Sequence, residues 1–186
     1  MNLTFKRKDG ITMMKIVLLT ETEKIKEGLR SLTDEFIEEY PYYSTWIHKN
    51  KETFQNGTRV IFELNDNGQT VGYMMIHFSS SRYAKINGVY VFPNCQKKGY
   101  AKSALLQVLS ELENRGLEYV YVQTRIHNKI VVHMFKSLHF YIIGKNYHSI
   151  EKQNNWVAVY DLKGKGNLDE MEKLAEQIYP GFSKNR

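Results

Sequence analysis

The stretch QKKGYA, residues 96 to 101, combines two lysines and a glycine with the start of a patterned helix. Gly99 and Ala101 carry almost no side chain where the first backbone N–H groups of a helix lack intrahelical acceptors. Such N–H groups and the helix dipole favour an anion, most often a phosphate. The stretch is therefore a candidate phosphate-binding loop. An ordinary loop-to-helix joint with solvated lysines is the alternative.

Two common phosphate motifs do not fit this loop. A Walker loop requires Gly-Lys-Ser/Thr, and here Gly99 is followed by Tyr100. The dinucleotide fingerprint requires two glycines before its helix, and only one is present. The loop is therefore not that of a P-loop NTPase or of a Rossmann dehydrogenase.

The helix behind the loop is predicted from apolar spacing. Leu105, Val108, Leu109 and Leu112 recur at positions that share one helical face. Arg115-Gly116 places a cation and then a glycine where a helix typically ends. A strand over 84–92 precedes the loop, and a strand over 117–126, apolar on both faces, follows the helix.

The rest of the chain supplies the elements that position this unit. Asn67-Gly68 joins two alternating runs and predicts a tight hairpin. The other expected elements are a strand at 15–20, a helix ending near 40, one shorter helix within 41–54, hairpin strands at 58–64 and 69–78, a helix at 128–138, strands at 140–150 and 155–162, and a terminal helix capped by Asn167.

This order predicts a mixed α/β fold with a mostly antiparallel sheet and a central strand–helix–strand crossover. It excludes a doubly wound fold, which alternates strand and helix throughout. We expect a flexible N-terminal extension at 1–14, one domain at 15–162 and a helical tail at 163–186. Met13 and Met14 also allow residues 1–12 to be a leader from an upstream start codon.

Composition narrows the class of protein. The chain has 186 residues, enough for a substantial core, and a net charge of +6 that favours acidic ligands. The single cysteine, Cys95, excludes a disulfide scaffold and fits the reducing cytoplasm. No metal cluster is expected from the spacing of cysteine and histidine, and no apolar run is long enough to span a membrane.

Two segments, in this order of elements, resemble the GCN5-related N-acetyltransferase (GNAT) family. The first family segment, Gln/Arg-x-x-Gly-x-Gly/Ala between a strand and a long helix, matches Gln96, Gly99 and Ala101. The second segment is NKIVVHMFKSLHF, with Asn128 at its head and Phe135 at the family's aromatic position. The resemblance covers roughly residues 15–162.

The resemblance implies acetyl-CoA as co-substrate and the loop as the segment around its pyrophosphate. It implies cofactor contacts from Val89, Tyr90, Val91, Gln96, Lys97, Lys98, Gly99, Tyr100, Ala101, Asn128 and Phe135. Main-chain groups of Val89 and Val91 would pair with the pantetheine arm, although this segment could equally be plain core strand. Asn128 would reach the same arm, and its alternative role is that of an N-cap.

The resemblance also implies acetyl transfer by direct attack of an amine, and here the chain departs from the pattern. Phe135 stands where many relatives carry a tyrosine acid, so the thiolate would take its proton from water, the substrate ammonium or a group such as Tyr100. His139 replaces the usual glycine before Phe140, which predicts a different turn.

No general base is evident. Glu63, His77, Tyr147 and His148 are candidates, each more readily explained as structural or solvated.

The resemblance implies that the acceptor is a primary amine of a small molecule or of a peptide or protein. Aromatic residues within YPYYSTWIHKN, residues 40–50, could line its pocket or serve helix packing. Monomer and homodimer are both compatible with the sequence.

A different class remains open on the same fold: a tRNA-acetylating toxin, an inactive RNA-associated protein or a CoA-sensing regulator. The net charge of +6 motivates the nucleic-acid versions. No stripe of lysines with interleaved aromatics supports them, so they are not favoured.

Overall fold

The computed structural model describes residues 2–4, 14–20, 22–37, 42–148 and 152–184. Its contacts divide the chain into two compact units. The first comprises Met1–Phe78 and Asn87–Val108, and the second comprises Ser79–Ile86 and Leu109–Arg186. The boundary passes through a strand and a helix, which is why no change of composition in the sequence marks it.

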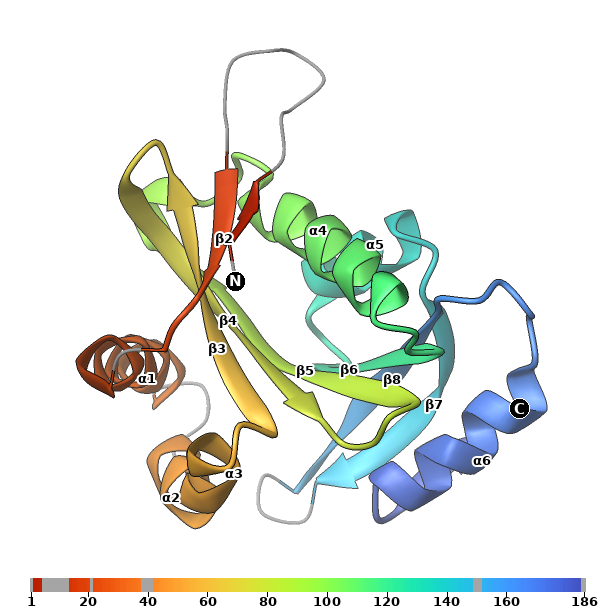
Figure 1. Cartoon of the computed structure of the whole chain (residues 1–186). Helices are drawn as coiled ribbons and strands as arrows, with labels where there is room; N and C mark the ends of the chain where they lie inside the picture. Colours follow the sequence, from red (N-terminus) through yellow and green to blue (C-terminus); the bar gives the residue numbers. More distant parts are fainter. Residues whose placement is uncertain (1, 5–13, 21, 38–41, 149–151, 185–186) are drawn as a thin grey trace. The chain divides into compact units, whose positions relative to one another are not determined.

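The first unit is built on antiparallel strands (Figure 1). In spatial order these are β1 (Asn2–Thr4), β2 (Met14–Leu18), β3 (Arg59–Asp66) and β4 (Gln69–Phe78), followed by the second half of β5 (Tyr83–Val91). Its helices are α1 (Thr22–Ile37), α2 (Tyr43–Lys49), α3 (Lys51–Gln55), the short 3₁₀ helix η1 (Pro93–Cys95) and the first part of α4 (Tyr100–Asn114).

The β3–β4 hairpin turns as its sequence predicts. Asn67 and Gly68 have φ angles of 51° and 89°, so both occupy the left-handed region that a type I′ turn requires. The register then alternates side chains between the faces, which places Ile61 and Tyr73 in the core with Leu32 of α1.

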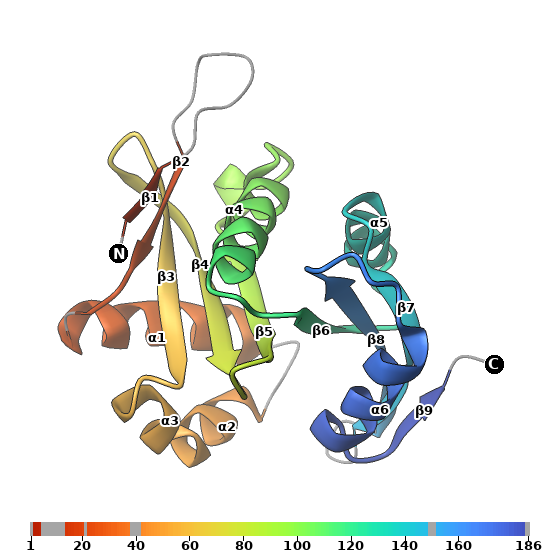
Figure 2. The same cartoon turned by 45° about the vertical axis from the view of Figure 1, so that its right-hand side comes forward.

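The second unit is a mixed sheet with the strand order β5, β6 (Tyr119–Arg125), β8 (Gln153–Asp161), β7 (Tyr141–His148) and β9 (Phe182–Lys184), as Figure 2 shows. β5 and β6 pair in parallel from Tyr83↔Tyr119 to Ile86↔Val122, and the other pairs are antiparallel. The helices are α5 (Lys129–Ser137) and α6 (Leu168–Ile178), with the end of α4.

Aromatic side chains form the core of this second unit. Tyr119 and Tyr121 of β6 are fully buried against Met171, Ala175 and Tyr179 at α6. The Tyr121 hydroxyl donates to the Met171 carbonyl at 3.0 Å, so the ring is buried without a lost hydrogen bond.

Ion pairs hold the start of α6 from outside this core. The Arg82 guanidinium donates to the carboxylates of Glu118 and Glu170. Hydrogen bonds from Arg82 hold the pKa values of both carboxyls below their usual range.

The predicted fold class and crossover are confirmed, and so is the Asn167 cap, whose side chain accepts from the Glu170 N–H at 3.1 Å. The expectation of one helix within 41–54 is wrong: α2 and α3 are separate and meet at Asn50. The strands β1 and β9 were not predicted, because three-residue strands carry no periodicity of their own. The part of the N-terminal extension at residue 1 and residues 5–13 lies outside the described residues.

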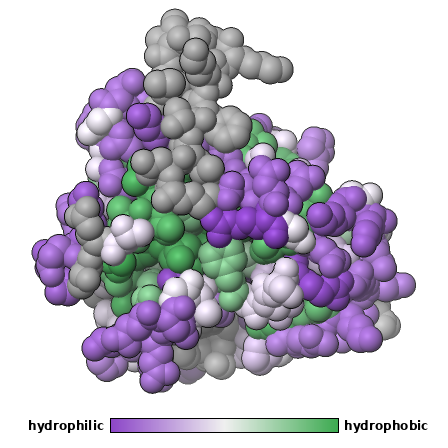
Figure 3. All heavy atoms as spheres, viewed as in Figure 1, coloured by the Kyte–Doolittle hydropathy of each residue, from purple (hydrophilic) through white to green (hydrophobic). Residues whose placement is uncertain are grey.

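The surface agrees with the amphipathic patterns. On the face in Figure 3, both hydrophilic and hydrophobic side chains are visible. No helix within the described ranges is long and apolar enough to cross a membrane. Among the same residues, no group of three or more His, Cys, Asp or Glu side chains could hold a metal ion.

Candidate functional site

Hydrogen bonds join the end of β5 in the first unit to β4 and to the loop that follows it. The Phe92 N–H donates to the Val71 carbonyl of β4 at 2.9 Å, and the Gln96 side-chain amide donates to the Val91 carbonyl at 3.1 Å. Gln96 therefore fastens the loop back onto the strand that leads into it. In this geometry its side-chain amide helps to position the loop.

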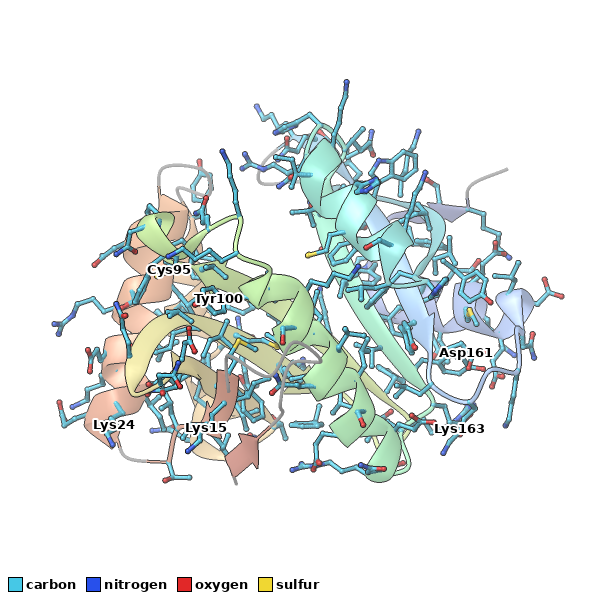
Figure 4. The ribbon with its side chains drawn as sticks, turned by 90° about the horizontal axis from the view of Figure 1, so that it is seen from above. Lys15, Lys24, Cys95, Tyr100, Asp161 and Lys163 are labelled. Carbon is cyan, nitrogen blue, oxygen red and sulfur yellow. The ribbon has the colours of Figure 1, made fainter. Side chains whose placement is uncertain are left out.

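The loop itself takes an open, turned conformation rather than continuing as helix. Lys97 and Gly99 have φ angles of 61° and 83°, both in the left-handed region. A lysine held there stores strain of about 1–2 kcal/mol, and such strain clusters at ligand-binding sites. Figure 4 labels Cys95 and Tyr100 at its two ends. Side chains do not close this stretch, because residues 96–99 are exposed.

The backbone N–H groups of this loop include unsatisfied donors. The Gly99 carbonyl accepts from the Ser103 N–H at 3.0 Å, which places Gly99 at the N-cap position, directly before α4. Within the described part of the chain, the N–H groups of Lys97, Gly99 and Ala101 have no hydrogen-bond acceptor. Alternating left-handed residues next to a helix N-terminus form a concave nest of donors that suits an anion.

Tyr100 connects the loop to the β3–β4 hairpin. Its hydroxyl donates to the Asp66 carboxylate. This bond fixes the first turn of α4 against the hairpin and directs the phenolic proton towards a carboxylate. The sequence could not show this pairing, because the two residues lie 34 positions apart.

Of the remaining predicted cofactor residues of β5, Tyr90 lies in the core of the same unit, and Val89 and Val91 alternate with it along the strand. Tyr90 is buried and packs edge-on against Phe92 at 5.7 Å, while Val89 and Val91 are half-buried. Gly72 of β4 lies against their backbone: a Cβ atom built there would be 2.0 Å from the Tyr90 carbonyl oxygen. Only glycine allows this approach.

Asn128 and Phe135 belong to the second unit and serve α5. The Asn128 side chain caps α5 by accepting from the Val131 N–H at 3.2 Å. Phe135 is buried, and its ring lies 5.2 Å from that of Phe140. The structural role that the sequence left open for Asn128 is therefore present.

The turn after α5 has a conformation that the sequence analysis did not expect. His139 has a φ of 63°, and the N–H groups of His139 and Phe140 donate to the carbonyls of Lys136 and Phe135. This is a Schellman motif, in which glycine normally occupies the left-handed position. The expectation of a different turn is wrong, because the helix-end hydrogen bonds impose that conformation on the histidine.

The candidate bases are distributed over both units. Glu63 in the first accepts from Asn65 and Thr70 at 2.9 and 2.8 Å, and His77 lies opposite Arg59 in the ladder. In the second unit, Tyr147 is exposed, and of His148 only the backbone in β7 is described. The hydrogen bonds of Glu63 give it a structural role, and none of the four is identified as a base.

The aromatic stretch before the hairpin packs on the first unit. Tyr43 and Trp46 stack at 5.5 Å between ring centroids, and both contact the core with Phe54. Helix packing, one of the two roles considered for this stretch, is therefore present for these side chains. Tyr40 and Pro41 lie outside the described residues.

Arg59 is a residue that the sequence analysis did not identify. It is only 5% exposed, with its guanidinium carbon 4.5 Å from the Trp46 ring centre and 5.5 Å from that of Phe54. Burial lowers the pKa of Arg59 to about 10, against a smaller opposite effect from Tyr43. The sequence did contain a signal for this position. Arg59 lies two residues before the buried Ile61, so both side chains are on the inward face of β3.

Comparison with known proteins bears on the whole arrangement. Residues 25–140, more than half of the chain, match the model of the Acetyltransferase (GNAT) family. The chain belongs to this family. As a GNAT protein it is an N-acetyltransferase that uses acetyl-CoA as co-substrate, which confirms the predicted class of enzyme and cofactor.

Individual relatives are distant. The GNAT chain is 25% identical over 104 residues to the [ribosomal protein bS18]-alanine N-acetyltransferase of Escherichia coli (strain K12), covering 56% of this chain and 70% of that protein. The crystal structure of the E. coli S18-alanine enzyme matches with a TM-score of 0.59 at 19% identity, covering 83% and 97% of the two chains. A Vibrio cholerae spermidine N-acetyltransferase in complex with CoA and spermine matches with a TM-score of 0.66 at 14% identity, covering 80% and 95%. At these identities the two structures support the fold alone.

Proposed function

We propose that this GNAT protein acetylates a primary amine of a small molecule or of a peptide or protein, and that its 96–101 loop binds the pyrophosphate of acetyl-CoA. The observation that supports this most is the set of N–H groups of Lys97, Gly99 and Ala101 at the head of α4, which lack acceptors among the residues that the structure describes. Each charge–dipole contact of this kind contributes about 0.3–1 kcal/mol. The lysines at 97 and 98 add positive potential.

The relatives support an amine acceptor. One acts on an alanine of a ribosomal protein and another on spermidine, by their names. Both names specify N-acetylation. We carry over the shared chemistry, an amine acceptor, and neither substrate.

We propose direct attack as the mechanism. The amine lone pair forms the N–C bond to the thioester carbonyl, the C–S bond breaks, and the CoA thiolate leaves and takes a proton. An alkylamine has a pKa near 10.4, so its deprotonation at pH 7 costs roughly 4–5 kcal/mol. A backbone N–H at the end of β5, near Val91, stabilises the oxyanion of the tetrahedral intermediate.

The proton for the thiolate does not come from Phe135, which has none to give. We propose water, the substrate ammonium or Tyr100 as the source. The Tyr100 hydroxyl already donates to Asp66, so a role for it would require this bond to exchange.

The loop assignment is tested by two matched glycine variants. Gly99 and Gly116 flank α4 and have the same φ of 83°. Gly99→Ala and Gly116→Ala therefore impose similar backbone strain, about 1 kcal/mol each, and nothing lies within 4 Å of the Cβ at Gly116.

We expect acetyl-CoA to raise the melting temperature of the wild type and of Gly116→Ala, because a ligand that binds only the folded state stabilises it. The shift should be smaller for Gly99→Ala, and isothermal titration should show weaker binding. Equal affinity in both variants would contradict the loop assignment. CoA thiol release with a panel of amines and peptides then identifies the acceptor.

Cytoplasmic localisation and a monomeric or homodimeric state stay part of this proposal. The lone Cys95 thiol is buried, which is compatible with a reducing compartment. Fractionation of cells and light scattering of the purified protein are the corresponding measurements.

A further inference from the structure

Arg59 carries a charge whose partner is missing from the described structure. Its side chain is 95% buried, at 5% exposure, and its Nε and Nη1 atoms have no hydrogen-bond partner there. Buried charges in proteins are normally paired, because leaving one unpaired is strongly destabilising. The described residues offer no carboxylate to Arg59.

The neighbouring aromatic rings do not replace that partner. Trp46 and Phe54 lie 4.5 and 5.5 Å from the guanidinium carbon and interact with its positive charge. The N–H donors of a guanidinium, however, lie in its plane and form a fork that matches a carboxylate or phosphate. The rings therefore hold the guanidinium in place and leave its donors to an anion.

The phosphates of the cofactor are not that anion. Asp66, which the loop residue Tyr100 contacts, is the last residue of β3, and Arg59 is the first. The eight residues of this strand span roughly 23 Å at about 3.3 Å per residue. A pyrophosphate bound by the loop at 96–101 cannot reach Arg59.

We propose that Arg59 binds a carboxylate of the acceptor, so that the preferred substrate is an amine that also carries a negative charge. This inference rests on the proposed acetyl transfer and names the substrate class. The burial of Arg59, its ring neighbours and its unpartnered donors all belong to the first unit. A polyamine, which carries only positive charges, fits this residue poorly because like charges repel.

The test compares acceptors that differ in one group. Suitable pairs are β-alanine with β-alaninamide, γ-aminobutyrate with its amide, and the C-terminally amidated dipeptides Ala-Asp and Ala-Asn. With the wild-type protein and acetyl-CoA, we expect kcat/KM to be about 10- to 100-fold higher for the carboxylate member of each pair that is acetylated. This ratio corresponds to the usual contribution of a hydrogen bond to a charged group. Spermidine should be poorer than the carboxylate acceptors.

The variant Arg59→Met keeps an apolar side chain of comparable length that contacts aromatic rings well. We expect it to bring the carboxylate-to-amide ratio close to one and to change kcat/KM for the amides less than about threefold. Arg115→Met, at an exposed position in the turn after α4, should keep the wild-type ratio. The melting temperature of free Arg59→Met should stay within about 3 °C of the wild type, since the charge that is removed has no ion-pair partner among the described residues.

Several outcomes would overturn the inference. A wild-type ratio near one, an unchanged ratio in Arg59→Met, or spermidine as the best acceptor would each do so. A large fall in the melting temperature of Arg59→Met with unchanged selectivity would assign Arg59 to a carboxylate of the chain itself. Thermal shifts by each acceptor in the presence of CoA provide a readout without turnover, so failed acetyl transfer and failed carboxylate binding are distinguishable.

Discussion

Replacing Gly72 with alanine should separate β4 from the end of β5. The added Cβ would lie 2.0 Å from the Tyr90 carbonyl oxygen and 3.0 Å from the Val91 Cα, and real Cβ atoms essentially never come closer than 3.0 Å. The obstructing atoms are backbone, so no side chain can rotate away. The two strands must therefore move apart by about 1 Å at this point.

The cost follows from that displacement. The hydrogen bond from the Phe92 N–H to the Val71 carbonyl, now 2.9 Å, would lengthen to about 3.9 Å and be lost. Overpacking of a core costs about 1–3 kcal/mol and an unsatisfied buried group a similar amount. We expect the free energy of unfolding to fall by roughly 2–4 kcal/mol, because the two effects partly overlap.

Urea denaturation of the wild type, Gly72→Ala and Gly68→Ala measures this effect. Gly68 has a φ of 89° with nothing within 4 Å of its Cβ, so its variant should lose only about 1 kcal/mol through backbone strain. Only Gly72→Ala should also weaken acetyl-CoA binding, because it displaces the strand proposed to pair with the pantetheine arm. A loss of less than about 0.5 kcal/mol, with intact affinity, would refute the reasoning.

Two further predictions concern stability in the second unit. His139→Gly should raise the free energy of unfolding by about 0.5–1 kcal/mol in urea, because glycine adopts the φ of 63° without strain; a loss would show that the histidine side chain stabilises the turn. Arg82→Met should reduce the loss of folding stability that occurs as the pH falls into the acid range. The pKa values of Glu118 and Glu170 are lowered in the folded state, so the stability they supply is present above the ordinary carboxyl pKa of about 4.3 and is lost as pH falls below it. The measurement is the melting temperature of the wild type and of Arg82→Met between pH 3 and 7. The same dependence on pH in both proteins would contradict this prediction.

Local rules of the sequence predicted much of the fold. The Asn67-Gly68 hairpin and the Asn167 cap depend on the φ preferences and side-chain oxygens of a few adjacent residues. The apolar spacing in α4 likewise needs no distant partner. The match of residues 96–101 to a helix start with bare backbone predicted the open loop for the same reason.

Two predictions failed where local hydrogen bonds decided the outcome. The stretch 41–54 has the composition of one helix, but the chain breaks it at Asn50, whose side-chain amide donates back to the Trp46 carbonyl. At His139, the hydrogen bonds that end α5 stabilise a positive φ, which a histidine otherwise rarely adopts.

The sequence by itself determined the order of the main elements, the resemblance to the family and the place of the loop proposed to bind phosphate, because periodicity, caps and turn residues act within a few positions. Only the tertiary structure decided that Tyr100 meets Asp66, that Gly72 must lack a side chain and that Arg59 is buried between aromatic rings. Those facts depend on residues brought together by strand pairing and packing, and burial turns an ordinary surface arginine into a charge that requires a partner.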